Sequence, residues 1–246
     1  MSRKCSGLSA WNPPHESSAN KFPALDQTTP RRPGISLLST STLMHPEILE
    51  ATQRNILPSL SVFSSKFGLV GGTAIAYIIG HRQSVDFDLF SVSPFDNIAI
   101  TSKLRSFAPI ERVFVDELDQ YEALVGGVRI TFLRYPYALD FSESFESTLR
   151  MPNLQTLSAM KLFALGRRAK WKDYVDLYFI LRDHSSLADT MIKAREMFGN
   201  EFNEKILREQ LAYFDDIDYS ESVSYLPGFE TPDETIRDFL IKASIA

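Results

Sequence analysis

The chain has 246 residues, 44% of them hydrophobic, and a formal net charge of −5 at pH 7. This length allows one or two domains with sizeable cores, and the mild acidity argues against a broad basic surface without excluding RNA as a substrate. The single cysteine, Cys5, excludes a disulfide framework or a cysteine metal site, no apolar run is long enough to cross a membrane, and a reducing cytoplasm is the expected location.

Residues 1–43 differ from the rest of the chain. They are rich in Ser, Pro and Thr and show no hydrophobic periodicity. Such a composition predicts a disordered tail. A second interpretation is a wrongly assigned start, because Met44 opens a plausible beginning for the protein.

The first predicted helical segment covers residues 45–66 and is kinked or divided at Pro58. The most informative stretch follows at 69–90, with the sequence LVGGTAIAYIIGHRQSVDFDLF. Its apolar start stops at two glycines. Thr73 is then expected to cap a short helix, and Gly80 is expected to end that helix in a left-handed conformation.

The end of this stretch has the alternation of a strand. Val85, Phe87 and Leu89 alternate with Asp86 and Asp88. Both carboxylates should therefore share one face, roughly 6–7 Å apart, and the three apolar side chains should enter a core. Because two adjacent carboxylates repel each other, a bound Mg²⁺ or Mn²⁺ is the expected reason for the pair.

The two glycines add an anion site to this prediction. Gly71 and Gly72 precede a helix N-terminus, where free N–H groups and the helix dipole favour phosphate. A phosphate cradle beside a metal pair is typical of phosphoryl or nucleotidyl transfer. The alternative is an ordinary buried strand whose aspartates lie at an exposed edge.

The remainder of residues 44–137 predicts a mixed sheet with flanking helices. A helix capped by Ser93-Pro94 should run to about Phe107. Three strands should follow at 110–115, 121–125 and 128–135, with Gly126-Gly127 as a two-residue hairpin turn.

A polar connector is predicted at 138–153, and a helical domain at 154–246. Its helices are expected at 154–168, 172–181, 187–197 and 203–214, followed by a last helix that a capping box at 231–234 opens. The acidic stretch 215–221 between the last two is expected to be a solvated loop.

Two of these helices carry further candidate residues. Lys161 and Arg168 are seven positions apart on the first, so they share a face. Asp173 and Asp176 share a face on the second. Taken singly, each has an ordinary explanation: a surface lysine, an acid favoured by a helix N-terminus, or an Asp176 that pairs with Lys172.

Together, these motifs resemble a known family. An apolar residue, two glycines, a spacer and Asp-apolar-Asp-apolar are similar to the signature of the DNA polymerase β-type nucleotidyltransferase superfamily. The string GGTAIAYIIGHRQSVDFDLF and the later SAMKLFALGRRAKWKDYVDLYFIL resemble one branch more closely, the nucleotidyltransferase AbiEii/AbiGii toxin family. The residues that fill the first signature are Val70, Gly71, Gly72, Asp86, Phe87, Asp88 and Leu89.

The resemblance implies an α+β fold: a polymerase β-type nucleotidyltransferase core followed by a helical C-terminal domain, with the active site between them. It implies Mg²⁺ or Mn²⁺ at Asp86 and Asp88, and catalytic roles for Lys161 at the triphosphate and for Asp173. The implied nucleotide-binding residues are Gly71, Gly72, Thr73, Arg82, Ser84, Arg168 and Asp176. Arg82 and Ser84 would either touch phosphate or structure their loop.

The implied function is transfer of a nucleoside monophosphate from a nucleoside triphosphate to RNA, such as a tRNA end, or to a protein. The protein would then be the toxin of a bacterial toxin–antitoxin or phage-defence pair, with a cognate antitoxin as partner. A degenerate nucleotide- or partner-binding protein and a small-molecule nucleotidyltransferase are the alternatives.

Two departures from the family pattern bear on these alternatives. Thr156 stands where the family usually has an acid, five positions before the lysine. A third metal-binding carboxylate is also missing from VRITFLRY, and Glu111 and Glu122 on neighbouring strands are equal candidates for it.

Overall fold

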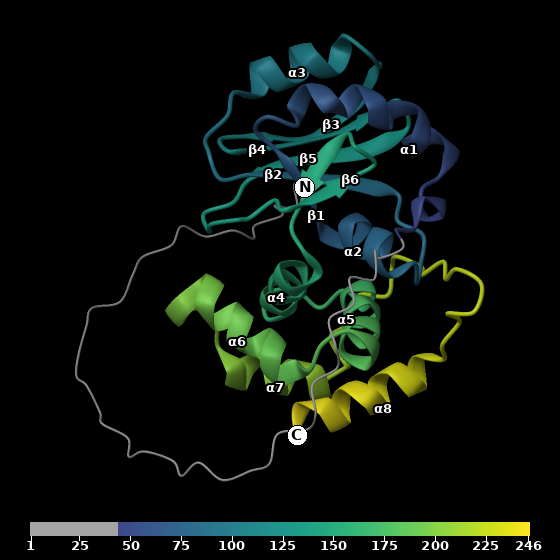
Figure 1. Cartoon of the computed structure of the whole chain (residues 1–246), viewed down its shortest axis with the longest axis vertical. Coiled ribbons are helices and arrows are strands. Elements are labelled where there is room, and N and C mark those ends of the chain that lie inside the picture. Colours follow the sequence, from purple (N-terminus) through teal and green to yellow (C-terminus); the bar gives the residue numbers. More distant parts are fainter. Residues whose placement is uncertain (1–43) are drawn as a thin grey trace, which may run out of the picture. The chain divides into compact units, whose positions relative to one another are not determined.

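The computed structural model describes residues 44–246 (Figure 1). The tail, or misassigned start, predicted for residues 1–43 lies outside the described residues. The described residues group into one compact unit. None of the helices within 44–246 is both long and apolar enough to cross a membrane.

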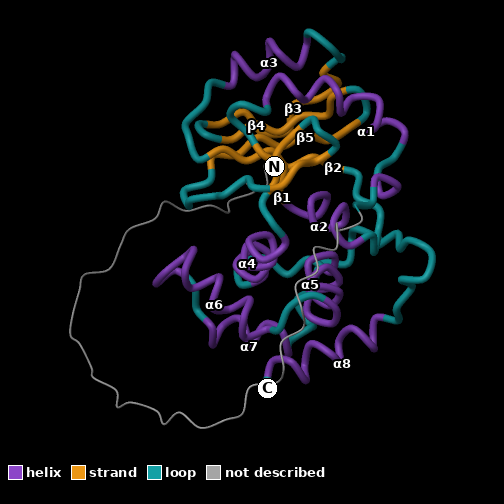
Figure 2. Tube along the Cα trace, viewed as in Figure 1, coloured by secondary structure: helices purple, strands orange, loops and turns teal. Residues whose placement is uncertain are grey.

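One seven-stranded mixed sheet forms the first half of the described chain, in the order β3-β4-β5-β2-β1-β7-β6. Strand β2 is antiparallel to β1 and parallel to β5, and Figure 2 shows the strands gathered above most of the helices. The predicted α+β class with a mixed sheet is therefore confirmed. The strands are β1 (Gly68–Val70), β2 (Asp86–Ser91), β3 (Ile110–Glu117), β4 (Gln120–Val125), β5 (Val128–Arg134), β6 (Glu143–Phe145) and β7 (Leu149–Met151).

Strand β2 has the predicted alternation over most of its length. Phe87 and Leu89 are fully buried, whereas Asp86 and Asp88 on the opposite face are half-buried. The expectation that Val85 also enters the core is wrong: the strand begins one residue later, and Val85 is 42% exposed.

Helix α2 (Gly71–Ile79) lies between β1 and β2 in the chain and is buried along most of its length. It begins at Gly71, so the prediction that Thr73 caps it is wrong; Thr73 lies in its first turn. Gly80 ends the helix with φ +75°, as predicted, because a residue without Cβ adopts this conformation without strain.

The earlier helical segment and the α3 start differ in detail from expectation. Residues 45–66 fold as η1 (Pro46–Ile48), α1 (Ala51–Ile56) and η2 (Leu57–Phe63), so the chain does change helix type next to Pro58. Helix α3 (Asn97–Arg105) is capped by Asp96, whose side chain accepts a hydrogen bond from the Ile98 N–H, and not by Ser93.

The stretch 138–153, expected to be only a connector, contains strands β6 and β7. Strand β7 pairs in parallel with β1 at Gly68 and Arg150 and antiparallel with β6. The sheet therefore continues past Tyr137 up to Met151. The Gly126-Gly127 hairpin is as predicted, with positive φ at both glycines.

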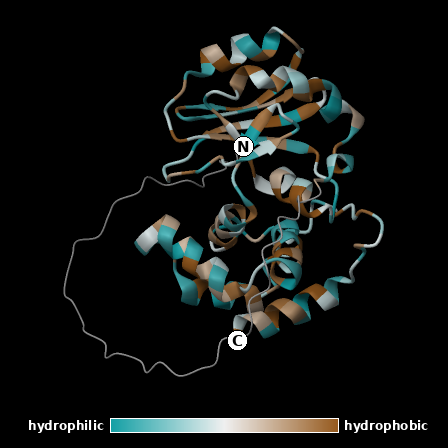
Figure 3. Cartoon of the chain, viewed as in Figure 1, coloured by the Kyte–Doolittle hydropathy of each residue, from teal (hydrophilic) through white to brown (hydrophobic). Residues whose placement is uncertain are grey.

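The second half is helical, with bounds close to those expected: α4 (Leu154–Leu165), α5 (Trp171–Asp183), α6 (Leu187–Phe198), η3 (Gly199–Glu201), α7 (Glu204–Ala212) and α8 (Asp233–Ser244). Helix α8 mixes hydrophobic and hydrophilic residues along its length (Figure 3), because only one side is buried. The predicted capping box is not formed: Thr231 donates to the Phe229 carbonyl, and Pro232 precedes the first turn.

Residues 213–232, here called the α7–α8 segment, run back over both halves. The Gln83 N–H donates to the Ser224 carbonyl, and the Leu226 N–H donates to the His81 carbonyl. At Asp218 the segment exchanges backbone hydrogen bonds with the turn that precedes α5. This segment is therefore fixed against the α2–β2 loop and against the start of α5.

Candidate active site

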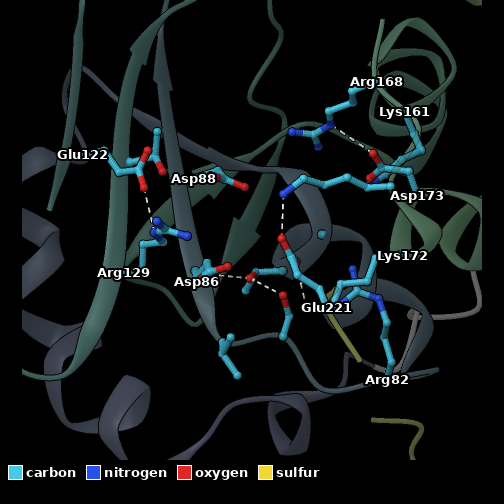
Figure 4. Close-up of a pocket in the computed structure, with 16 residues that line it drawn as sticks. Arg82, Asp86, Asp88, Glu122, Arg129, Lys161, Arg168, Lys172, Asp173 and Glu221 are labelled. Atoms are coloured by element: carbon cyan, nitrogen blue, oxygen red, sulfur yellow. Dashed lines mark hydrogen bonds and ion pairs between the residues drawn. The ribbon is translucent and has the colours of Figure 1, made fainter. Parts of the chain in front are cut away.

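A polar cavity lies where β2, the α2 N-terminus and helices α4 and α5 meet. Figure 4 shows the two strand aspartates with Glu122 and Arg129 on one side, and Lys161, Arg168 and Asp173 on the other. The lining residues are Gly72, Thr73, Arg82, Ser84, Val85, Asp86, Asp88, Glu122, Arg129, Thr131, Lys161, Arg168, Lys170, Lys172, Asp173 and Glu221.

The strand aspartates form no ion pair within residues 44–246. The cations around them pair with other carboxylates, Arg129 with Glu122 and Lys161 with Asp173. Burial raises the pKa of Asp86, and burial together with the charge of Asp86 raises the pKa of Asp88. The pair is thus poorly compensated.

This pair suits a divalent cation. Carboxylate oxygens are the ligands that Mg²⁺ prefers, and Mg²⁺ is commonly held by one or two carboxylates together with substrate phosphates and water. No group of three or more His, Cys, Asp or Glu side chains in the described part of the chain is arranged to hold a metal by itself. Asp86 and Asp88 therefore fit a metal that arrives with a phosphate ligand.

The two glycines at the start of α2 are required by close packing inside the protein itself. A Cβ on Gly71 would collide with the carboxylate of Asp88, and a Cβ on Gly72 would collide with the guanidinium of Arg82. Gly71 also has φ +73°, which side-chain-bearing residues rarely adopt. The glycines let Asp88 and Arg82 approach the helix N-terminus.

Thr73 and Ser84 join the two ends of the motif. The Thr73 hydroxyl donates to the Asp86 carbonyl, and its oxygen lies 2.8 Å from the Ser84 hydroxyl oxygen. Both side chains are buried and line the cavity. They hold the beginning of β2 against α2. This contact fixes the Asp86 backbone, from which its carboxylate extends.

Asp176 is the centre of a buried charge network. Its carboxylate accepts two hydrogen bonds from Arg82, at 2.6 and 2.9 Å, and one from His81 at 2.7 Å. Lys161 lies 2.9 Å from its second oxygen. Burial alone would raise the pKa of Asp176, but Arg82 and Lys161 outweigh it and lower the pKa well below its usual value.

Asp173 connects this network to the cavity. It accepts from Lys161 at 2.7 Å and from Arg168 at 3.0 Å. Burial is again outweighed, here by Lys161 and Arg168, so the pKa of Asp173 is lowered. Asp173 is therefore a fixed negative charge whose cationic neighbours hold its orientation.

The ordinary explanations for two of these residues fail, and the predicted placement of a third, on one helix face with Lys161, is wrong. Lys161 is not a surface lysine, because it is 6% exposed and bonded to two aspartates. Asp176 does not pair with Lys172, which instead lies 3.2 Å from Glu221. Arg168 is not on α4, which ends at Leu165; it lies in the following turn and reaches Asp173 from there.

The structure separates the two candidates for a third carboxylate. Glu122 lines the cavity and pairs with Arg129, Nε to Oε1, at 2.6 Å. Glu111 instead accepts from the Gly127 N–H at the hairpin turn and does not line the cavity. Thr156 also lies elsewhere, beside Leu139 and Lys193 at a separate hollow.

Four charged lining residues were missed by sequence reasoning: Arg129, Lys170, Lys172 and Glu221. Arg129 had a detectable signal, because it belongs to a strand next to β2. Lys172 stands in the KDxxDL string but was considered only as a partner for Asp176. Glu221 carried no usable signal, since it lies in an acidic stretch without periodicity.

Comparisons with known proteins point to one family. Residues 56–240 match the family described as nucleotidyl transferase AbiEii toxin, type IV TA system. An uncharacterised protein of Aquifex aeolicus (strain VF5) is 27% identical over 154 residues, which are 61% of this chain and 74% of that protein.

Two solved structures share the fold at low sequence identity. MenT4, a nucleotidyltransferase toxin from Mycobacterium tuberculosis H37Rv, superposes with a TM-score of 0.57 at 13% identity, covering 78% of this chain and 81% of that one. A putative nucleotidyltransferase from H. pylori gives a TM-score of 0.51 at 16% identity, over 79% and 90% of the two chains.

Proposed function

The chain belongs to the AbiEii nucleotidyltransferase toxin family of type IV toxin–antitoxin systems, and we propose that it transfers a nucleoside monophosphate from a nucleoside triphosphate to a hydroxyl of RNA or protein. The observation that supports this proposal best is one cavity with two parts. The poorly compensated Asp86 and Asp88 lie on one side, and the paired Lys161 and Asp173 lie on the other.

In the proposed reaction, the acceptor hydroxyl oxygen bonds to the α-phosphorus, and the bond from that phosphorus to the oxygen bridging to the β-phosphate breaks. Pyrophosphate leaves with the negative charge, and the hydroxyl proton passes to a base. A divalent cation at Asp86 and Asp88 would supply charge neutralisation and lower the pKa of the attacking hydroxyl.

The protein's own residues would position the triphosphate. Gly71, Gly72 and Thr73 contribute the N–H groups of the α2 N-terminus, which favour anions. Lys161 has three donor hydrogens and bonds two aspartates, so one remains for phosphate. Asp173 holds Lys161 and Arg168 in place, and their positive charge would stabilise the departing pyrophosphate.

Arg82 and Asp176 would act through structure. They form a buried bidentate pair, which favours a structural role for Arg82 over direct contact with phosphate. We assign them to positioning: Arg82 supports Gly72, and Asp176 supports Lys161. The acceptor, a cognate antitoxin protein and a cytoplasmic site of action are parts of the same proposal.

The test is transfer of label by the purified full chain. Each of the four nucleoside triphosphates, labelled at the α-phosphate or at the γ-phosphate, is incubated with Mg²⁺ and either total RNA or protein extract. A nucleotidyltransferase moves the α-label and not the γ-label, which excludes a kinase. Transfer of no α-label, with triphosphate binding retained, would instead identify a nucleotide-binding protein without catalysis.

Variants then assign the residues. Asp86→Asn combined with Asp88→Asn should abolish transfer, and Lys161→Ala or Asp173→Asn should lower the rate about 100- to 1000-fold, the usual loss for one preorganised charge contact. The loss should be larger in kcat than in KM, because the charge develops during reaction. Asp183→Asn, which breaks an exposed pair with Arg182, is the matched control.

A further inference from the structure

The cations around the cavity differ in how firmly the protein holds them. Arg82 and Lys161 are almost completely buried and bonded to carboxylates that are themselves buried. Removing such a charge from its partner leaves an uncompensated ion in a low-dielectric interior, which is costly. These cations are therefore not free to exchange partners when a ligand arrives.

Lys170 and Lys172 are held differently. Both bond to one carboxylate, Glu221, whose Oε1 lies 2.6 Å from the Lys170 ammonium and whose Oε2 lies 3.2 Å from that of Lys172. All three side chains line the cavity and remain partly exposed, with Glu221 at 38%. Exposed pairs of this kind contribute little free energy, so a competing anion can replace the carboxylate.

Glu221 also lies on a different element from the two lysines. Lys170 directly precedes α5 and Lys172 lies in its first turn, whereas Glu221 lies in the α7–α8 segment, three residues beyond Asp218 and three before Ser224. Backbone bonds fix the segment at those two residues but not at Glu221 itself. The carboxylate can therefore swing away without breaking the segment's attachment.

From this arrangement we propose that Lys170 and Lys172 are a triphosphate-binding pair, and that Glu221 is a resident carboxylate which the triphosphate displaces from them. The proposal rests on the proposed function, because it assigns the polyphosphate of that substrate to these lysines. Displacement places two free ammonium groups across the cavity from Asp86, where Figure 4 shows Lys172 and Glu221. A substrate with a single phosphate competes poorly with a carboxylate that already bridges both lysines.

The direct experiment measures binding of inorganic triphosphate to the full chain by calorimetry at low ionic strength. Glu221→Gln should tighten binding about five- to tenfold, the worth of one or two exposed ion pairs. Lys170→Ala combined with Lys172→Ala should weaken binding by a similar factor. Orthophosphate should show little change in either variant.

The decisive measurement is the triple variant. If Glu221 acts mainly by occupying the lysines, Glu221→Gln should raise triphosphate affinity much less once both lysines are alanine, because only direct charge repulsion then remains. Glu204→Gln is the matched control, because Glu204 also bridges two basic residues, Arg195 and Arg208, but lies outside the cavity. It should leave triphosphate affinity unchanged.

Trp171, which lies between the two lysines in the chain, allows a second measurement. Its ring lies 5.3 Å from that of Tyr219 in the α7–α8 segment. In a Trp11→Phe background it is the single tryptophan. Triphosphate should change the fluorescence of Trp171 when Glu221 is present, and should change it much less when Glu221→Gln is added.

Weaker or unchanged triphosphate binding by folded Glu221→Gln would overturn the proposal, as would a gain that is equally large without the lysines. If Glu221→Gln does not fold, the lysine double variant decides, and unchanged affinity there overturns the proposal as well. Because inorganic triphosphate needs no acceptor, these results are independent of whether nucleotide transfer occurs. Transfer without displacement, or displacement without transfer, would therefore be recognised as such.

Discussion

Asp86 and Asp88 are kept next to each other at a cost in folding free energy. Burial raises the pKa of both, and no cation in residues 44–246 pairs with either. A raised folded-state pKa means that the carboxyl group favours the folded state while it is protonated. That contribution is present below the unfolded pKa and is lost as pH rises through the folded pKa.

At neutral pH in the absence of divalent metal, Asp86→Asn combined with Asp88→Asn should therefore raise the melting temperature. The difference from wild type should shrink as pH falls toward the raised pKa values, because the wild-type carboxyl groups then become neutral too. Calorimetry at a series of pH values measures both effects. In the presence of Mg²⁺, only the wild type should gain stability, through binding to the native state.

Asp176 has the opposite balance. Its folded pKa is far below the usual value, so its contribution is present above the unfolded pKa and is lost as pH falls. Asp176→Asn should destabilise the fold by about 3–5 kcal/mol, since it leaves Arg82 and Lys161 buried and under-compensated.

Chemical denaturation at pH 7 and at pH 4 tests this value. Asp183→Asn, which removes the exposed partner of Arg182, should cost at most about 1 kcal/mol and serves as the control. Equal losses for the two variants would show that the buried network does not stabilise the fold.

The sequence predicts some features of this site and not others. The shared face of Asp86 and Asp88 could be predicted, because side chains two positions apart on a strand point to the same side. The bond between Arg82 and Asp176 joins positions 94 apart in the chain, and no local pattern encodes which cation meets which carboxylate. The pairing depends on how α2 packs against α5, which only the folded structure determines.

At the scale of elements, the long periodic ones were predicted and the short ones were not. Strands β4 and β5 have clear alternation and a Gly-Gly turn between them. Strands β6 and β7 have three residues each, in a polar stretch, and exist because they pair with each other and with β1. Pairing between distant segments stabilises such strands, and composition does not reveal it.

The start of α2 gives a prediction that separates backbone strain from close contact. Gly71 and Gly127 have similar positive φ, +73° and +79°, but a Cβ at Gly71 meets Asp88 and a Cβ at Gly127 meets nothing within 4 Å. Gly127→Ala should cost about 1–2 kcal/mol from strain alone. Gly71→Ala should cost more and should also weaken the Mg²⁺-induced rise in melting temperature, because Asp88 must move.

Thermal unfolding of the two variants, with and without Mg²⁺, makes the comparison. Gly127→Ala should retain the full metal response, since its turn lies outside the cavity. Loss of the metal response in both variants would mean that strain, and not the contact with Asp88, is responsible.

At the scale of the described chain, the sheet and the helices share one core. Helix α2 is buried from Thr73 to Ile79 and contacts β1 and β2 as well as α4 and α5. A helix covered on most sides belongs to the interior of a single folding unit. His81 and Arg82, which follow α2, are buried against Asp176 of α5, and this adds charge pairing to the shared apolar contact.

The chain should therefore unfold in one transition, although the sequence favours a boundary at 138–153. Returning a large apolar side chain to water costs about 1.5–3 kcal/mol. Exposing two or three such side chains of α2 would cancel most of a typical free energy of unfolding of about 5–15 kcal/mol. Calorimetric and van't Hoff enthalpies of the full chain should agree, and Asp176→Asn should lower the single transition without splitting it. Two resolved transitions, or a fragment 44–153 with native near-ultraviolet dichroism, would show that the core folds without α4 and α5.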